Sequence, residues 1–201
     1  MKGMAEPTAH PEPAARPGHT AQQARTQAAI IAAAIASLAA DPKATMGEIA
    51  RAAGVGRATI HRYFPERADL LKSLVDLALR NASAAHQRAR LTEGTAREAV
   101  ARLCSEYAEL GPLQAILMAG ALPDEEMDAH PLNAPQNAEV AAVLPRGHAD
   151  GSLDPTLDEA WFMGTIWAYT TLAFEYMYQP GANRHAVVSE YLRRVDRAIR
   201  T

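Results

Sequence analysis

Cysteine is almost absent from this chain of 201 residues, because Cys104 is the single one. A lone thiol can form neither an internal disulfide nor a thiolate metal site, so we expect a reducing, cytoplasmic location. Aromatic residues make up only 5% of the chain, which disfavours an all-β fold because strands prefer aromatic and β-branched side chains. No apolar run approaches the roughly 18–20 residues of a membrane span, and no secretory signal opens the chain. We therefore expect no membrane partner.

Catalytic motifs are also missing. The sequence contains no H-E-x-x-H pair, no glycine-rich phosphate loop and no G-x-S-x-G turn. His130, His148 and His185 fall in expected loops or at helix starts, and Cys104 lies in an expected helix, where a buried, inert thiol is the ordinary case. The sequence thus predicts no catalytic residue, no metal site and no cofactor.

Alanine, the best helix former, is used very heavily, and 48% of the residues are hydrophobic. Apolar residues recur at spacings of three and four along most of the chain, which predicts an all-α fold of about nine helices. We expect these helices over residues 20–40, 46–53, 57–64, 66–90, 95–110, 113–122, 138–146, 157–178 and 184–200. Residues 1–19 hold four prolines and no apolar repeat, so they are predicted to be a disordered arm. Residues 123–139 are acidic and proline-containing, which predicts a loop with one short helical piece.

Charge is distributed unevenly between the two parts of the chain. Residues 1–80 carry ten Lys and Arg against seven Asp and Glu, whereas residues 81–201 carry ten against sixteen. Two ordinary solvated surfaces would explain the imbalance, and so would a basic face for a polyanion within residues 43–72.

Residues 45–64 predict two short helices joined by a tight turn. Thr45 and Glu48 have the spacing of a capping box, which satisfies exposed amides at a helix start. Gly54 stands where the chain must turn sharply, because glycine adopts a positive φ at little steric cost. Ile60 and Phe64 lie four residues apart and can face a core. This arrangement is a helix-turn-helix.

The outward face of the second short helix carries groups that can contact DNA. Polar donors there suit phosphates and base edges, and a helix is thin enough to enter a major groove. An ordinary helical hairpin with a solvated polar face is the alternative. The face consists of Arg57, Ala58, Thr59, His61, Arg62 and Tyr63.

Residues 27–74 resemble the DNA-binding domain of the TetR family of transcriptional regulators. The motifs that carry this resemblance are the threonine-led helix, A-x-x-A-G-V from Ala50, T-I-x-x-Y-F-P from Thr59, and D-L-L from Asp69. The later phrase A-D-G-S-L-D-P at residues 149–155 is similar to a turn that often precedes the eighth helix of the family. Gly56 departs from the pattern, because a serine is frequent there, and so do His61 and Arg62, which replace frequently aromatic residues.

The resemblance implies roles for individual residues. Thr45 and Arg67 would contact phosphates, Thr59, His61 and Tyr63 would contact phosphates or base edges, and Arg57 would read a base. It also implies a helix-turn-helix domain over residues 20–65, joined by a long helix to a ligand-binding and dimerisation domain over residues 66–201. The last two helices would pair with their copies in a homodimer.

The helix expected over residues 157–178 carries large apolar side chains on more than one face, so a single core stripe does not account for them. A partner subunit or a lined cavity would bury the second face. We expect a small-molecule pocket lined by Tyr107, Met118, Trp167, Thr170, Phe174 and Tyr178.

Residues 103–145 hold seven carboxylates and no Lys or Arg, four of the seven within 124–128. This fits an entrance for cationic ligands or a solvated acidic loop.

Two functions remain open from the sequence. The first is a ligand-responsive regulator, a repressor that binds a pseudo-palindromic DNA operator as a dimer and is released by a small-molecule effector. The second is a small-molecule-binding or catalytic helical protein in which the N-terminal hairpin is only structural.

Overall fold

A computed structural model of the chain describes residues 17–118 and 133–200. These residues form ten helices and no strand, which confirms the all-α prediction. The helices are α1 (Pro17–Ala40), α2 (Met46–Ala52), α3 (Arg57–Tyr63), α4 (Arg67–Ala89), α5 (Ala96–Ala108), α6 (Pro112–Met118), α8 (Asn133–Ala141), α9 (Val143–Asp150), α10 (Glu159–Met177) and α11 (Arg184–Ile199).

Several helices begin or end at other residues than the sequence predicts. Helix α1 begins at Pro17, so residues 17–19 are helical, while the rest of the predicted arm lies outside the described residues. Helix α8 begins at Asn133, within residues 123–139, where the sequence predicts a loop with one short helical piece. Pro135 falls in the first turn of α8, where a backbone N–H would have no intrahelical partner, so the missing N–H of proline costs nothing there. The acidic residues 124–128 lie outside the described part of the chain.

Helix α9 runs to Asp150, four residues beyond the predicted end at 146. Gly147, which reads as a helix breaker, is required here by packing. A Cβ atom at Gly147 would overlap the side chain of Leu153, which is fully buried where the chain folds back over the helix. The backbone amide of Leu153 also donates to the Gly147 carbonyl at 3.2 Å.

The first hydrophobic core holds the N-terminal helices together. Ile30 and Leu38 of α1 pack with Ile49 of α2 and Ile60 of α3, all essentially inaccessible to solvent. The first half of α4 belongs to the same core, and so does α6 through Leu113, Ile116 and Leu117. The helix-turn-helix therefore rests on α4 and α6 and not on residues 20–65 alone.

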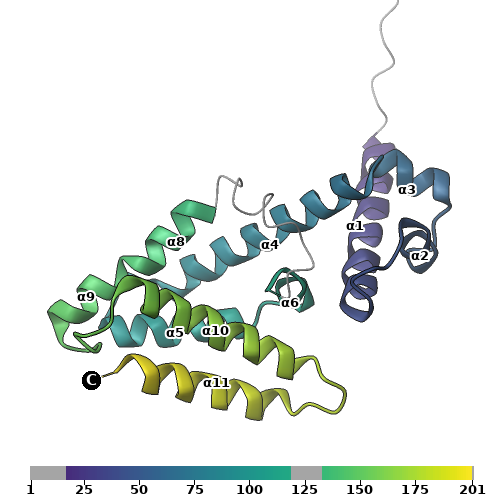
Figure 1. The fold of residues 1–201 in the computed structure, drawn as a ribbon. Coiled ribbons are helices and arrows are strands. Elements are labelled where there is room, and N and C mark those ends of the chain that lie inside the picture. Colours follow the sequence, from purple (N-terminus) through teal and green to yellow (C-terminus); the bar gives the residue numbers. More distant parts are fainter. Residues whose placement is uncertain (1–16, 119–132, 201) are drawn as a thin grey trace, which may run out of the picture.

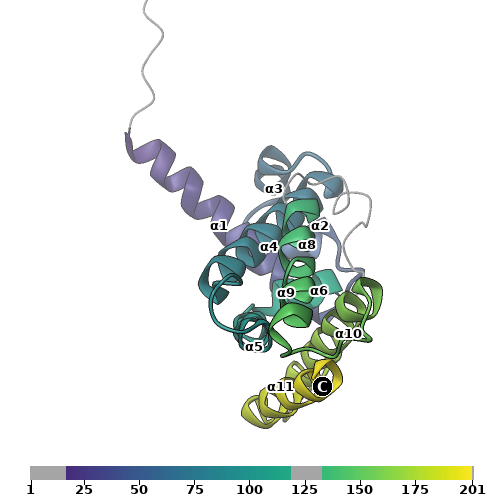
Figure 2. The ribbon, with the colours of Figure 1, turned by 90° about the vertical axis from the view of Figure 1, so that its left-hand side faces the viewer.

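The second core lies among the end of α4 and helices α5, α8, α9, α10 and α11. Its largest fully buried side chains are Phe162 and Phe174 of α10, with Leu103 of α5 and Ile199 of α11. Helix α4 crosses from the helix-turn-helix to the opposite end of the molecule and so joins the two cores (Figure 1). Helices α10 and α11 lie side by side on the face farthest from α4, with α11 outermost (Figure 2).

None of the helices described here is long and apolar enough to cross a membrane.

Candidate DNA-binding surface and ligand cavity

The start of α2 is fixed by the capping box that the sequence predicts. The Thr45 hydroxyl accepts from the Glu48 amide at 3.3 Å, and the Thr45 amide donates to Glu48 Oε2 at 2.7 Å. The Thr45 hydroxyl also donates to Glu48 Oε2 at 2.8 Å. These hydrogen bonds hold the pKa of Glu48 below its usual value. The hydroxyl proton of Thr45 is thus engaged internally, and the amides of Met46 and Gly47 are the ones without an intrahelical partner at this helix start.

The turn between α2 and α3 is a Schellman motif. Gly54 has a φ of +67°, its amide donates to the Arg51 carbonyl at 3.1 Å, and the Val55 amide donates to the Ala50 carbonyl at 2.9 Å. This pattern closes the C-terminus of α2 and requires a residue that tolerates a left-handed conformation. The predicted role of Gly54 is confirmed. Gly56 then begins α3 without a side-chain cap, as its departure from serine implies.

Helix α3 presents its predicted face to solvent. Arg57, Ala58, His61 and Arg62 are exposed, whereas Thr59 and Tyr63 are half-buried. These exposed groups form the α3 surface.

Side chains of the α3 surface are held by local contacts. The Arg57 guanidinium lies over Gly47 of α2, because a Cβ atom there would be 3.5 Å from its Nε. The Arg62 guanidinium lies 5.4 Å from the centre of the Tyr63 ring. His61 donates from Nδ1 to the Pro65 carbonyl at 3.0 Å, which leaves Nε2 facing outward. Contact of the α3 surface with base edges stays a prediction.

Arg67 has an internal role that the resemblance did not imply. Its side chain, at the start of α4, donates from Nη1 to the Ala44 carbonyl and from Nη2 to the Pro42 carbonyl at 3.2 Å. The half-buried guanidinium of Arg67 thus connects α4 to the turn before α2 by hydrogen bonds. A phosphate contact by Arg67 stays a prediction, and it would have to use the remaining N–H groups.

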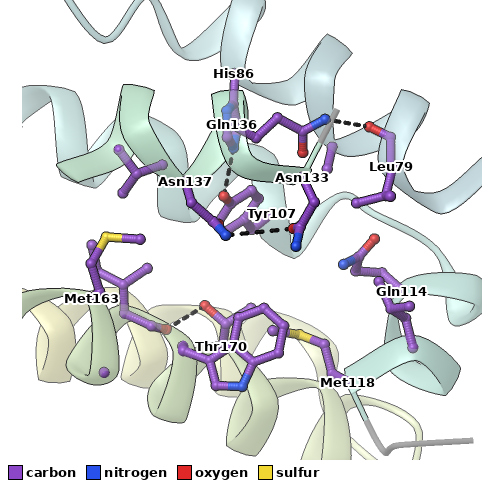
Figure 3. A pocket seen from close by; sticks show the side chains of 16 residues that line it. Leu79, His86, Tyr107, Gln114, Met118, Asn133, Gln136, Asn137, Met163 and Thr170 are labelled. Carbon is purple, nitrogen blue, oxygen red and sulfur yellow. Dashed lines mark hydrogen bonds between the residues drawn. The ribbon is translucent and has the colours of Figure 1, made fainter. Parts of the chain in front are cut away.

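A cavity of about 440 Å³ opens between helices α4, α5, α6, α8 and α10 (Figure 3). Ligand pockets of proteins commonly fall in the range of about 300–1,000 Å³. Its wall comes from five helices and mixes aliphatic, amide and aromatic side chains. The lining residues are Leu79, Ala82, His86, Tyr107, Gln114, Leu117, Met118, Asn133, Gln136, Asn137, Val140, Met163, Gly164, Ile166, Trp167 and Thr170.

Four of the six residues predicted for a pocket line this cavity: Tyr107, Met118, Trp167 and Thr170. Phe174 and Tyr178 do not. Phe174 lies one turn beyond Thr170 and is buried in the second core, and Tyr178 stacks on it at the end of α10 with ring centroids 6.2 Å apart. The prediction followed the aromatic content of this helix. Both rings lie on the same side of α10 as Thr170, because residues four apart share a helix face, but they are one and two turns beyond it and past the lining residues.

A chain of polar groups crosses the cavity wall from α4 to α8. Nε2 of His86 lies 2.6 Å from the Tyr107 hydroxyl, and Nδ1 lies 3.3 Å from Glu139 Oε2. Burial lowers the pKa of His86, while its hydrogen bond and charge interaction with Glu139 act in the opposite direction. Burial raises the pKa of Tyr107, so its hydroxyl remains protonated at neutral pH.

On the other side of the cavity, Thr170 is a structural residue as well as a lining one. Its hydroxyl donates to the Ile166 carbonyl at 2.7 Å and lies 2.7 Å from the Tyr191 hydroxyl of α11. Cys104 is fully buried near Tyr191, and burial raises its pKa to about 11, which fits the inert thiol expected from the sequence.

Comparisons with known proteins agree with this geometry. Residues 30–74 match the family model described as bacterial regulatory proteins, tetR family. The HTH-type transcriptional repressor LfrR of Mycolicibacterium smegmatis is 35% identical over 166 residues, covering 82% of this chain and 85% of LfrR. This chain belongs to the TetR family.

Solved structures of transcriptional regulators have the same architecture. The crystal structure of the TetR-like regulator LfrR from Mycobacterium smegmatis in complex with proflavine has a TM-score of 0.68 at 32% identity, covering 90% of this chain and 99% of that one. The structure of the ketosteroid transcriptional regulator KstR2 of Mycobacterium tuberculosis has a TM-score of 0.70 at 18% identity, covering 88% of this chain and 95% of KstR2. At this identity the similarity shows only that the two proteins share a fold. The protein is therefore a TetR-family transcriptional regulator.

Three carboxylates of the acidic stretch of this TetR-family protein lie among the described residues, and each of them is close to an Arg or His side chain. Glu106 pairs with Arg88 at 2.6 Å, and Glu109 lies 3.4 Å from Arg184. Glu139 lies beside the cavity, where it faces His86, and 61% of its side chain is exposed. Among the described residues, no group of three or more His, Cys, Asp or Glu side chains could hold a metal ion.

Several lining residues were not predicted from the sequence. The most informative are His86, Gln114 and Gln136, which are buried polar residues. His86 follows an alanine-rich stretch and Gln114 interrupts an apolar one, which was an available signal because buried polar side chains need partners. Gln136 lies among other polar residues and gave no such signal.

Proposed function

We propose that this TetR-family regulator is a dimeric repressor whose affinity for operator DNA falls when a small molecule fills the cavity. Such a repressor acts in the cytoplasm, where the operator lies. The α3 surface and the start of α2 would contact DNA, with Arg57 reading a base. The assignment of residues 20–65 to DNA binding and of residues 66–201 to effector binding and dimerisation is part of this proposal.

The observation that carries the proposal concerns α6. Gln114, Leu117 and Met118 of this helix line the cavity. Leu113, Ile116 and Leu117 of the same helix pack into the core of the helix-turn-helix, and α6 contacts α1 directly. A molecule that moves α6 therefore acts on the domain that holds α3. Helix α4 provides a second connection between the cavity and the helix-turn-helix, because its Leu74 lies in the first core and its His86 lines the cavity.

The outer face of α10 and α11 supports a dimer. Leu172 and Tyr176 of α10 remain 41% and 50% exposed, and they border a groove with Val187 of α11. Exposed apolar patches of this kind mark interaction sites on monomers, and a self-complementary patch produces a two-fold dimer. A two-fold dimer would place its recognition helices about 34–36 Å apart, or at a multiple of one DNA turn.

The relative LfrR has been solved with proflavine, a flat tricyclic cation, which supports a flat organic molecule as the effector here. The effector must bind the operator-binding and the operator-free conformations of the protein with different affinities, because a ligand that binds both equally shifts no equilibrium.

The proposal is tested by binding to duplex DNA selected from a random pool with the full-length protein. We expect a pseudo-palindromic consensus, with affinity that falls as salt rises from 50 to 200 mM, because phosphate contacts release counterions. A protein that selects no sequence and binds no duplex at low salt would favour the alternative, a small-molecule-binding helical protein.

A further inference from the structure

Gln136 of α8 connects the wall of the cavity to α4. The residue is 7% exposed, and its Nε2 donates to the Leu79 carbonyl at 2.9 Å. A carbonyl oxygen can only accept, so the nitrogen of the carboxamide must face Leu79 and its oxygen must face the other way. This hydrogen bond therefore fixes the orientation of the Gln136 amide.

The oxygen of Gln136 is an acceptor that a molecule in the cavity can reach. None of the described residues donates to Oε1, and the atom is not sealed from the surface, as Oε1 of Gln114 is. Gln136 lines the cavity, and Figure 3 shows its oxygen on the side of the amide away from Leu79, directed toward the space that Met163 and Thr170 border from below.

Other lining residues also have hydrogen-bonding capacity left, but they offer it differently. Asn133 and Asn137 lie one turn apart on α8, joined by a long hydrogen bond of 3.5 Å, and Asn137 is exposed. An exposed amide exchanges water for ligand at little net gain, so it selects weakly. The Gln114 amide directs its nitrogen toward the open space and needs an acceptor (Figure 3). Gln136 combines burial, a fixed orientation and a reachable acceptor.

The charge and composition of the wall limit what the bound molecule can be. No Lys, Arg, Asp or Glu lines the cavity within the described residues. An anionic ligand would lose its hydration without gaining a cation. Helix α10 lines the cavity with Met163, Ile166 and Trp167, which suit an apolar surface and a flat ring. These features fit a flat, apolar molecule that is neutral or cationic.

We propose that Gln136 determines the specificity of the cavity by accepting a hydrogen bond from an N–H or O–H group on the edge of such a molecule. This inference rests on the cavity being the effector site of the proposed repressor. Water can occupy Oε1 in the free protein, so a ligand that displaces the water without supplying a donor leaves a buried acceptor unpaired and binds more weakly. The same amide is bonded to Leu79, whose side chain lies in the first core, so the ligand contacts α4 through one side chain.

Two acridine dyes test this requirement without DNA. Proflavine carries two NH₂ groups on the edge of its ring system, and acridine orange has the same rings with both amino nitrogens dimethylated, so those donors are absent. The ring N–H is common to both dyes. The measured quantity is the ratio of the affinity for proflavine to the affinity for acridine orange, determined by fluorescence titration of the full-length protein and compared between variants.

Gln136→Met keeps the length of the side chain and carries no comparable acceptor. We expect the ratio to fall about 5- to 150-fold relative to wild type, because the proflavine amino group is buried without a partner and acridine orange no longer covers an unpaired oxygen. The variant also loses the hydrogen bond to Leu79, so its melting temperature should fall. Gln136→Glu is the second variant. It keeps an acceptor, and its charge acts on both cationic dyes alike, so the ratio should stay close to that of wild type.

Gln114→Met is the matched control, because it makes the same chemical change on α6, where the oxygen is sealed from the cavity. This variant should leave the dye ratio unchanged. A fall as large as that of Gln136→Met would show that the general polarity of the wall, and not the Gln136 oxygen, selects the ligand.

An unchanged ratio in Gln136→Met, or a ratio lost in Gln136→Glu, would overturn the proposal. Failure of wild type to bind proflavine would overturn it as well. The proposed repressor function fails in a different way, namely if the dyes bind with the expected ratios but operator affinity does not change.

Discussion

The hydroxyl oxygen of Tyr107 lies 2.6 Å from Nε2 of His86, inside the wall of the cavity. The carboxylate of Glu139 can only accept from Nδ1, so the proton of the neutral imidazole lies on Nδ1 and Nε2 accepts from Tyr107. This chain links α4, α5 and α8 and fixes the His86 ring at the edge of the ligand space.

Tyr107→Phe removes the donor to Nε2 and keeps the aromatic ring. We expect the free energy of unfolding to fall by about 1–3 kcal/mol, because a buried imidazole nitrogen is left without a partner. Urea denaturation measures the change, with Tyr169→Phe as a control on a half-buried ring. A Tyr107→Phe protein as stable as wild type would mean that the hydrogen bond contributes nothing to the fold.

Stability should depend on pH through His86. Burial lowers its pKa in the folded state below the usual 6.5, so the unfolded chain binds the proton more readily. The stability that the neutral His86 ring contributes is fully present above pH 6.5. As the pH falls toward the pKa of the folded state, the free energy of unfolding decreases by at most about 1.4 kcal/mol per pH unit.

The comparison uses the free energy of unfolding at pH 7.5 and 5.5. Wild type should lose more stability over this interval than His86→Gln, which cannot titrate at this position. Equal losses in both proteins would show that His86 binds the proton equally well in the folded and unfolded states.

Arg57 and Arg67 should separate base recognition from support of the fold. Arg57→Ala removes an exposed side chain, so we expect an unchanged melting temperature, a loss of about 1–3 kcal/mol in operator binding and relaxed preference at one base position. Arg67→Ala removes two hydrogen bonds to the carbonyls before α2 and should lower the melting temperature. Identical specificity and stability profiles of the two variants would contradict this division.

Much of the helix-turn-helix could be predicted from the sequence because its determinants are local. The Thr45–Glu48 box and the glycine turn at Gly54 each act within a few residues, and the structure contains both. Arg67 shows the limit, because its partners Ala44 and Pro42 lie more than twenty residues away in sequence.

Predicting the cavity from the sequence was harder because its wall is assembled from distant helices. Aromatic content correctly indicated Trp167 but also suggested Phe174 and Tyr178, which lie on the face of Thr170 but farther along α10 than the cavity extends. Gln114 has no local feature that reveals its unpaired oxygen. Only the surroundings of the side chain, which belong to several helices, leave that oxygen without a partner.

Leu172→Glu should produce monomers. This side chain lies on the exposed apolar face of α10, so a charge there would be desolvated in a dimer but solvated in a monomer. Sedimentation at micromolar concentration should show a dimer for wild type and a monomer of unchanged helicity for the variant, with reduced operator affinity. A monomeric wild type would contradict the proposed assembly.

Gly164 provides a way to block the cavity without disturbing the core. It lines the cavity from α10, and a Cβ atom there would have no neighbour within 4 Å. Gly164→Leu should therefore preserve folding and operator binding while reducing the room for a ligand, with stability at least as high because leucine favours the helix. Fluorescence titration with proflavine should give weaker binding than in wild type.

The most direct test measures operator affinity with and without proflavine for wild type and Gly164→Leu in parallel. The pair is needed because a flat cationic dye also intercalates into DNA, and that effect is common to both proteins. We expect wild type to lose about 5- to 150-fold in affinity beyond any loss of the variant, which corresponds to a typical coupling free energy between two sites. Equal losses in both proteins, at dye concentrations that saturate the wild-type cavity, would contradict the claim that the cavity controls DNA binding.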